Sequence, residues 1–292
     1  MADPSKRLAL NAAGAFFVDS TCIDCDACRQ LAPETFGEAR DSSYVAAQPS
    51  TEAQTRRALH ALLSCPTGSI GTIGANGAKQ TMRDFPLLLE AEVSYAGFNS
   101  ADSYGGNSYV VQHPAGNWLI DSPRYVKHLV RRFEELGGLR YLFLTHRDDV
   151  ADSDRYATRF GSQRIIHRHE LAAQPDAEIV LDGADPVHLA ADFTIIPTPG
   201  HTRGHCVLLY RNRFLFTGDH LSWDRDAQRL HASRRVCWHS WPEQKRSMAR
   251  LLDYSFAWVL PGHGQRVNLP EEQMRKELAA LVGRMEGGGG VR

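Results

Sequence analysis

The sequence predicts two domains, a small α+β domain over residues 1–78 and a larger domain over residues 79–292 in which strands alternate with helices. A chain of 292 residues is long enough for two domains. Four of its six cysteines lie within the first 65 residues, whereas from residue 85 short apolar runs alternate with helical patterns, as in an α/β layer fold. Between these parts, the glycine-rich and polar segment 71–80 (GTIGANGAKQ) is typical of a linker.

Charge and hydropathy exclude several classes of partner. The net charge of −1 gives no reason to expect nucleic acid, whose binding proteins carry a basic patch. The longest apolar run falls far short of the roughly 18 residues that a membrane-spanning helix needs. The N-terminal segment lacks the long apolar core of a secretory signal. We therefore expect neither a nucleic-acid nor a membrane partner, and a cytoplasmic location.

The cysteines of the first domain have the spacing of a cluster or metal site. Cys22, Cys25 and Cys28 follow one another at two-residue intervals in CIDCDACRQLAP, and Cys65 comes 36 intervening residues later, before Pro66. In a reducing compartment such spacing indicates a metal or cluster rather than disulfides. Thiolates bind iron–sulfur clusters, with the loop holding three corners and a remote cysteine the fourth. A zinc site closed by the same four cysteines is the alternative.

The segment 51–64 (TEAQTRRALHALLS) predicts a helix that would bring Cys65 back to the loop, from the helical spacing of Ala58, Leu59, Leu62 and Leu63. Over roughly residues 14–75 the cysteine pattern resembles the bacterial-type ferredoxins. Two-cluster members of that family carry a further cysteine before the proline at Pro33, where this chain has Ala32. The resemblance therefore implies one cluster, and Cys25 at the middle position implies [4Fe–4S] rather than [3Fe–4S].

The second domain has the local patterns of a layered fold. A hairpin is predicted with strands at Tyr109–Gln112 and Trp118–Ile120. Helices are predicted at 123–136, 153–160, 242–253 and 270–285, three of which open with proline.

Several apolar runs in this domain end in a metal-binding residue type. RYLFLTH ends in His146, FTIIPTPGH in His201, and FAWVLPGHG carries His263, while Asp219 follows the run FLFTG. Strand ends that meet at one edge of a sheet can fix such side chains rigidly in one site. Three other histidines match no ligand position and are expected to pack or to form hydrogen bonds: His205, His220 and His239.

The ordered motifs TH, TPGHTRGH, FTGD and LPGHG resemble the metallo-β-lactamase fold over about residues 85–285, and are most similar to its glyoxalase II and persulfide dioxygenase branches. The resemblance implies an αββα sandwich. The family's first loop is usually Thr-His-x-His-x-Asp-His. Aligned without a gap, His146 is kept, but Asp148, Val150 and Ala151 replace the later ligands. With a two-residue insertion, Asp152 would take the place of the family aspartate. Either alignment removes at least one ligand of a second metal.

By this resemblance a single iron would be held by His146, His201 and Asp219, the facial triad that leaves positions open for substrate. His263 and Asp148 would support these ligands or bind as alternates. The sequence thus predicts an iron–sulfur redox protein, a mononuclear-iron oxidoreductase that uses a redox partner such as a reductase and acts on a small molecule. The resemblance suggests a sulfur-containing one.

Two alternatives remain open at this stage. One is a single-zinc thioester or ester hydrolase in which Asp148 or Asp152 positions a water molecule. The other is a non-catalytic electron carrier whose second metal site has degenerated.

Overall fold

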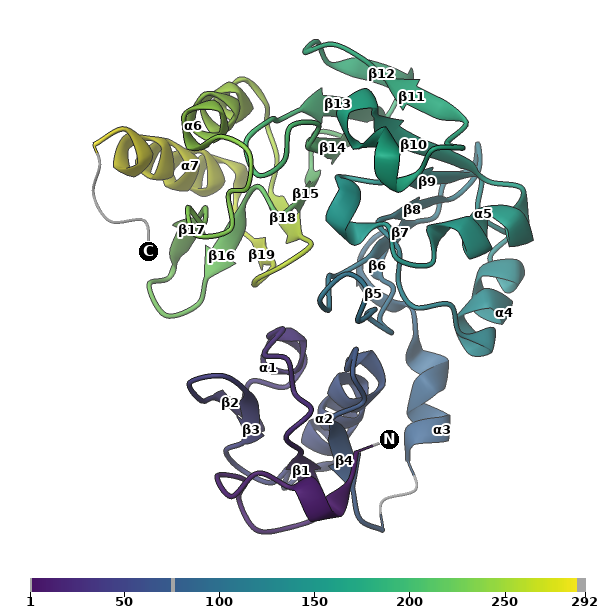
Figure 1. Cartoon of the computed structure of the whole chain (residues 1–292), viewed down its shortest axis with the longest axis vertical. Coiled ribbons are helices and arrows are strands. Elements are labelled where there is room, and N and C mark those ends of the chain that lie inside the picture. The colour runs from purple at the N-terminus through teal and green to yellow at the C-terminus, as the bar shows by residue number, and fades with distance from the viewer. Residues whose placement is uncertain (1, 75–76, 288–292) are drawn as a thin grey trace. The chain divides into compact units, whose positions relative to one another are not determined.

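A computed structural model describes residues 2–74 and 77–287 of the chain (Figure 1). The chain divides into two compact units, one of Met1–Leu142 with Ala151–Ser162 and the other of Phe143–Val150 with Gln163–Arg292. The predicted domain boundary between residues 78 and 79 stays a prediction. Among the described residues, every helix is too short or too polar to cross a bilayer.

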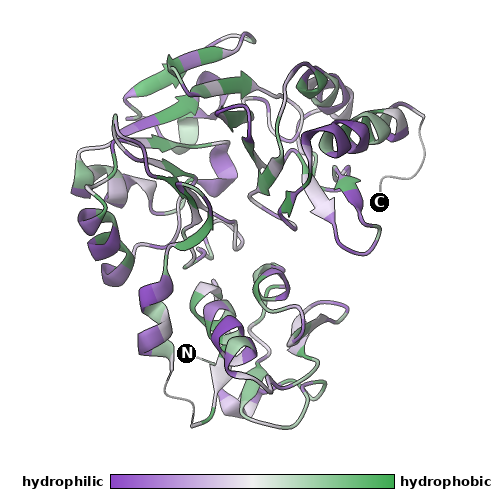
Figure 2. Cartoon of the chain, turned by 180° about the vertical axis from the view of Figure 1, so that it is seen from behind, coloured by the Kyte–Doolittle hydropathy of each residue, from purple (hydrophilic) through white to green (hydrophobic). Residues whose placement is uncertain are grey.

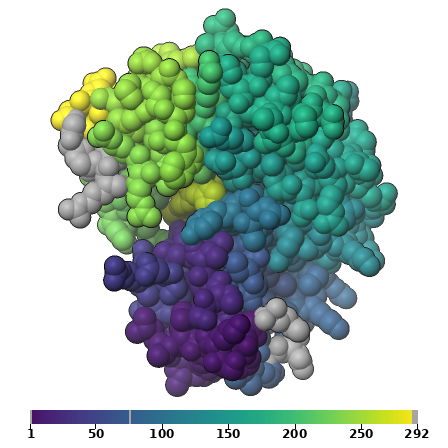
Figure 3. All heavy atoms as spheres, viewed as in Figure 1, coloured from purple at the N-terminus to yellow at the C-terminus, as the bar shows by residue number. Residues whose placement is uncertain are grey.

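The N-terminal part of the first unit is a small α+β body, and in Figure 3 its first residues form a continuous purple surface. Strands β1 and β4 pair antiparallel, with Phe17 opposite Gly71, and strands β2 and β3 form a hairpin. Its elements are β1 (Phe16–Val18), α1 (Ala27–Leu31), β2 (Phe36–Glu38), β3 (Ser43–Val45), α2 (Glu52–Ser64) and β4 (Ile70–Thr72).

Helix α2 confirms the helix predicted at 51–64. It begins with a capping box, in which the Thr51 hydroxyl accepts from the Gln54 backbone N–H while the Gln54 side chain accepts from the Thr51 backbone N–H. Its buried face, including Ala58 and Leu59, packs in one core with strands β1 and β4. The helix ends at Ser64 with Cys65 as its capping residue, so this packing fixes the position of the remote cysteine.

The predicted linker at 71–80 is shorter than expected. Strand β4 extends to Thr72, and helix α3 (Ala78–Thr81) already begins within the segment. Residues 75–76 lie outside the described residues.

The rest of the first unit contains strands β5 (Leu87–Glu90), β6 (Val93–Tyr95), β7 (Tyr109–Val111), β8 (Trp118–Ile120) and β9 (Tyr141–Phe143), with helices α4 (Lys127–Glu135) and α5 (Ser153–Phe160). The strand order is β9-β8-β7-β6-β5, and the predicted hairpin of β7 and β8 is confirmed. Helix α4 starts four residues later than the 123–136 prediction, because the Arg124 backbone N–H donates to the Phe98 carbonyl and keeps this segment extended.

The second unit is built around a six-stranded sheet with the order β12-β13-β14-β15-β18-β19. Strands β15 and β18 are parallel and the other neighbours are antiparallel, so the sheet is mixed. Its strands are β12 (Val187–Ala190), β13 (Phe193–Pro197), β14 (Cys206–Tyr210), β15 (Phe214–Gly218), β18 (Trp258–Pro261) and β19 (Val267–Asn268). The unit also contains the parallel pair β10 (Gln163–His167) and β11 (Ile179–Leu181), and the hairpin β16 (Ser222–Asp224) and β17 (Arg229–His231).

Helices α6 (Trp241–Arg250) and α7 (Glu271–Glu286) cover one face of this sheet (Figure 1). Figure 2 shows hydrophobic strands next to helices whose surfaces are partly hydrophilic. Met248 from α6 and Leu278 from α7 are buried against strand residues such as Val259. The predicted helix at 242–253 continues beyond α6 only as a 3-10 turn, Leu251–Asp253.

Candidate cluster and metal sites

The four clustered cysteines line one small cavity in the first unit, together with apolar residues of β1 and β4. The chain between the first three cysteines turns through left-handed backbone at Asp24 (φ 57°) and Asp26 (φ 65°). Aspartate tolerates this conformation better than most residues because its short polar side chain bonds locally. The Ser69 backbone N–H lies 3.3 Å from Cys65 Sγ, the geometry of a donor to a thiolate.

Arg29 holds the cluster loop in place, a role that the sequence analysis missed. Its guanidinium donates to Asp24 at 2.6 Å, to Asp26 at 2.7 Å and to the Ser43 hydroxyl at 2.6 Å. The Arg29 side chain is only 7% exposed, so these bonds compensate for its removal from water. The arginine thereby ties both left-handed residues of the loop to strand β3.

The spacing of the thiols favours a cluster over a single zinc. A zinc ion bound at about 2.3 Å would hold its four sulfurs about 3.8 Å apart. Within the described part of the chain, however, no three cysteine sulfurs lie within 4.8 Å of one another. Burial raises the pKa of Cys25 to about 12 and also raises the pKa of Cys22 and of Cys28. Thiols this buried stay protonated at neutral pH, so an incoming cluster must displace their protons.

The loop between β6 and β7 packs directly against the cluster loop. A Cβ atom on Gly105 would lie 2.8 Å from Cys25 Sγ, and Gly105 has φ +86°. Asn99 braces this loop, since its Nδ2 donates to the Gly105 carbonyl at 2.7 Å and its Oδ1 accepts from the Tyr95 hydroxyl at 2.5 Å. Glycine is therefore required at position 105 both for the backbone conformation and for the close approach.

In the second unit four predicted residues face a common point. His146 follows strand β9, His201 follows β13 and Asp219 follows β15. Asp219 Oδ2 lies 3.8 Å from His146 Nε2 and 3.6 Å from His201 Nε2, and Asp148 Oδ2 lies 3.7 and 3.6 Å from the same two nitrogens. Tetrahedral ligands at about 2.1 Å from an ion are about 3.4 Å apart, so the arrangement fits one metal ion with a small contraction.

The hydrogen bonds around these residues are also those expected of metal ligands. His146 Nδ1 lies 2.9 Å from the Thr145 hydroxyl, which orients the ring and turns Nε2 toward Asp219. Among the described residues, Nε2 of His146 and Nε2 of His201 are buried without a hydrogen-bond partner. A bound cation would satisfy both nitrogens.

The charge of the donors suits a cation. Burial lowers the pKa of His146 to about 4, so this ring is neutral and able to ligate at pH 7. The ring of His201, whose Nε2 lies 3.6 Å from Asp148 Oδ2, lowers the pKa of Asp148. Burial alone would raise the pKa of Asp219, but His263 and then His146 outweigh it, and the pKa lies far below its usual range. Both carboxylates are therefore ionised.

Asp149 is a further acidic residue of the site, beside Asp148 and Asp219, and the sequence analysis missed it. The 3-10 turn Arg147–Asp149 tucks Asp149 inward until it is 1% exposed, while the Asp148 side chain stays 46% exposed. Asp149 forms a second potential ligand group with His146 and Asp219. A Cβ atom on Gly262 would lie 2.6 Å from Asp149 Oδ2, so glycine there makes room for the carboxylate. The two adjacent aspartates in HRDDV are the sequence feature that could have indicated Asp149.

The remaining predicted residues have clear partners. His263 Nδ1 lies 2.8 Å from Asp219 Oδ1, so this ring supports the carboxylate from its other oxygen. The structure does not bring Asp152 into either ligand group: its carboxylate accepts from the Tyr125 backbone N–H at 2.7 Å and from Arg155 at 3.1 Å. Its predicted catalytic role stays a prediction.

His205, His220 and His239 lie outside both ligand groups, and both ring nitrogens of the buried His220 lack a hydrogen-bond partner among the described residues. His205 Nε2 accepts from the Asp219 backbone N–H at 3.3 Å, and its Nδ1 therefore carries the proton that faces Thr198 Oγ1 at 2.9 Å. Burial lowers the pKa of His220 to about 3. His239 lies 3.2 Å from Glu243 on helix α6.

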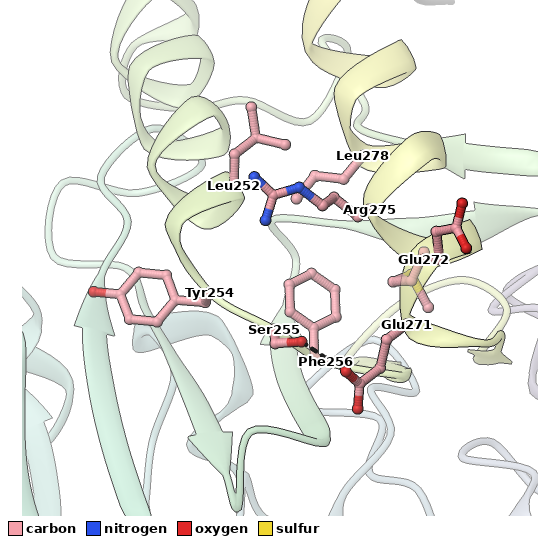
Figure 4. A pocket seen from close by; sticks show the side chains of 9 residues that line it. Leu252, Tyr254, Ser255, Phe256, Glu271, Glu272, Arg275 and Leu278 are labelled. Atoms are coloured by element: carbon pink, nitrogen blue, oxygen red, sulfur yellow. Dashed lines mark hydrogen bonds between the residues drawn. The ribbon is translucent and has the colours of Figure 1, made fainter.

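A separate pocket of about 210 Å³ opens beside helix α7 and is shown in Figure 4. Arg275 reaches across it, and the Ser255 hydroxyl donates to Glu271 at 3.0 Å. Its lining contains neither histidine nor cysteine, so it does not offer a metal site.

Comparison with known proteins finds relatives for both parts of the chain. Residues 18–72 match the family described as the 4Fe-4S single cluster domain of Ferredoxin I, a range that includes all four clustered cysteines. A hydroxyacylglutathione hydrolase from Acidiphilium cryptum (strain JF-5) is 29% identical over 125 residues, which is 41% of this chain and 50% of the relative. The chain thus spans about half the length of the curated relative it matches.

Solved structures identify the fold of the larger part. A metallo-β-lactamase from Hirschia baltica matches with a TM-score of 0.52 and 14% identity, covering 67% of this chain and 96% of that chain. ETHE1 from Myxococcus xanthus matches with a TM-score of 0.46 and 18% identity, covering 68% and 92%. The chain therefore consists of a single-cluster ferredoxin domain followed by a metallo-β-lactamase fold, with mixed sheets flanked by helices.

Proposed function

We propose that this chain is an iron–sulfur oxidoreductase in which the ferredoxin domain exchanges electrons with a single iron in the metallo-β-lactamase-fold domain. The observation that carries the proposal is that a [4Fe–4S] domain shares one chain with a buried site of two histidines and carboxylates. Zinc has no redox chemistry, so an electron-transfer domain would serve no purpose beside a zinc hydrolase. Two histidines and a carboxylate are the donor set of non-haem iron.

Each residue has a defined part in this proposal. Nε2 of His146 and of His201 and Oδ2 of Asp219 would hold the ion, with Asp148 as a fourth donor. Asp148 is the half-exposed member of this set and would face the side from which a substrate enters. His263 keeps the Asp219 carboxylate oriented through their 2.8 Å contact. An iron ion held here would supply one-electron chemistry to a small substrate.

The cluster gives this reaction its electrons. We propose that a soluble redox partner such as a reductase delivers them to the cluster, and that the substrate contains sulfur, as the resemblance to the persulfide dioxygenase branch suggests.

The test is the metal content of the purified chain, together with a variant that removes one ligand. We expect about five iron per chain, of which four belong to the cluster. His201→Ala should lower the count to about four while the visible spectrum of the cluster stays intact. His239→Ala is the matched control, because His239 lies outside both ligand groups and should keep the full count. Four iron in the unaltered chain would exclude the iron site.

The single-zinc hydrolase remains the second candidate. It is favoured by the local identity to a hydroxyacylglutathione hydrolase, which covers half of that enzyme. In this case the same metal measurement would give four iron and one zinc, and thioester hydrolysis would proceed equally well with the cluster oxidised or reduced. A chain that contains four iron and no further metal would instead be an electron carrier.

A further inference from the structure

A cleft of about 730 Å³ lies in the first unit, apart from the residues of the metal site. It is bounded by β1, β4 and the end of α2, and on its other side by α3 and the start of α4. All of its lining residues fall within residues 2–128, so a single compact unit contains it. Its volume is within the range of about 300–1,000 Å³ that small-molecule sites occupy.

The floor of the cleft is apolar and adjoins the cluster. Apolar side chains from both sides line it, among them Phe17, Leu62, Ile70 and Phe98. Cys65 lines both this cleft and the small cavity that contains the four cluster cysteines. A molecule in the cleft would therefore lie directly behind the remote cluster ligand.

One wall of the cleft is positively charged. Arg124 and Lys127 line it together with the neutral ring of His128, and none of the lining residues is acidic. Arg124 Nε is a buried atom without a hydrogen-bond partner in the described part of the chain. Lys127 is also the first residue of α4, whose capping residue Val126 provides no side-chain acceptor, so the positive end of the helix dipole is open toward the same wall.

We propose that this cleft binds an amphiphilic organic anion. The anionic group lies against Arg124 and Lys127, and the hydrocarbon or aromatic body fills the apolar floor toward Cys65. The unpartnered Nε–H of Arg124 provides a donor for an anion and disfavours a cationic ligand. Because the bound charge lies beside a cluster ligand, it opposes the addition of an electron and lowers the midpoint potential of the cluster. The site thus couples ligand binding to cluster redox state, and it does not depend on the metal of the second unit.

Calorimetric titration of the full-length, cluster-loaded protein tests the binding. We expect octanoate to bind at one site per chain, and 1-octanol, which has the same hydrocarbon chain without the charge, to bind at least tenfold more weakly. Octyl phosphate in a parallel titration distinguishes a preference for phosphate from one for carboxylate. If neither anion binds at millimolar concentration, or if 1-octanol binds as well as octanoate, the proposal is wrong.

Two charge-reversal variants on one helix separate the cleft from the general charge of the chain. Lys127→Glu should weaken octanoate binding at least tenfold, whereas Arg131→Glu, at an exposed position outside the lining, should leave it unchanged. An equal loss in both variants would mean that the anion responds only to net charge and would overturn the assignment.

The second measurement is the midpoint potential of the cluster. Saturating octanoate should shift it to more negative values in the unaltered chain and in Arg131→Glu, but not in Lys127→Glu. Visible spectra establish that both variants keep the cluster. Octanoate binding without any shift of the potential would overturn the proposed coupling to the cluster.

Discussion

Replacing Gly105 by alanine should loosen the cluster loop without replacing any of the four cysteines. The new Cβ atom would lie 2.6 Å from Cys25 Cβ, 2.8 Å from Cys25 Sγ and 3.1 Å from Pro66 Cγ, all shorter than ordinary van der Waals contact. Gly105 also has φ +86°, a conformation that side chains with a Cβ rarely adopt. The substitution therefore destabilises the folded protein in two ways, through the steric contact and through the backbone conformation.

The cost of the positive φ and the cost of the steric contact can be separated by substituting a second glycine as a control. A positive φ costs about 1–2 kcal/mol for a residue with a Cβ atom. Overpacking against a fixed neighbour adds about 1–3 kcal/mol. Gly137 has φ +95°, and a Cβ atom there would meet nothing within 4 Å, so Gly137→Ala carries the first cost alone. The difference between the two variants should be about 1–3 kcal/mol, and it belongs to the contact with Cys25 and Pro66.

The assay is the rate at which an iron chelator bleaches the visible absorbance of the cluster under anaerobic conditions. A difference of about 1–2 kcal/mol corresponds to a factor of about 5–30 in the population of the opened loop. Gly105→Ala should therefore lose its cluster at least fivefold faster than Gly137→Ala. Equal rates of cluster loss in the two variants would refute the inference that the loop between β6 and β7 packs on the cluster loop.

Three further substitutions test other parts of the structure. Arg29→Met should destabilise the cluster loop by about 3 kcal/mol because it strands two carboxylates, whereas Arg40→Met, at a 95% exposed position, should change the melting temperature little. Burial lowers the pKa of His231 in the folded protein. The stability that the neutral His231 ring permits is therefore present above about pH 6.5 and is lost as the pH falls through the lower pKa of the folded state. His231→Gln should make the melting temperature vary less between about pH 7.5 and 5. Trp238 is 60% exposed with its ring 6.2 Å from that of His201, so metal loading should change tryptophan fluorescence and Trp238→Phe should remove most of that change.

The cluster site was accessible to sequence analysis because its ligand pattern is local. Three cysteines at two-residue spacing fix one loop, and the helical spacing before Cys65 predicts how the fourth returns. Arg29 was not accessible in this way. Its partners are ordinary acidic residues in a loop, and only the left-handed backbone at Asp24 and Asp26 turns their carboxylates toward one buried guanidinium.

The metal site could be predicted only where its ligands follow strands. Asp219 comes directly after β15, and His201 lies four residues after the end of β13, which is separated from β15 in the sheet only by β14. The first loop is different, because a 3-10 turn decides which of two adjacent acids is buried. A one-residue shift in that turn would exchange Asp148 and Asp149, and no periodicity in the sequence reports it. The carboxylate of Asp152, farther along the same loop, instead accepts from the Tyr125 backbone N–H and the Arg155 side chain.

The altered first metal-binding loop and the ferredoxin domain both fit the redox chemistry proposed for this chain. Replacing a loop histidine by Asp148 exchanges a neutral nitrogen donor for a charged oxygen donor, and Asp149 adds a second acid close to Asp219. Two histidines with one carboxylate are the donor set of non-haem iron(II), and further carboxylates suit hard divalent ions such as manganese. For the iron ion that we propose, the [4Fe–4S] domain of the same chain is the kind of group able to supply electrons. The loop changes that remove the ligands of a second metal are therefore compatible with the single-iron site proposed above.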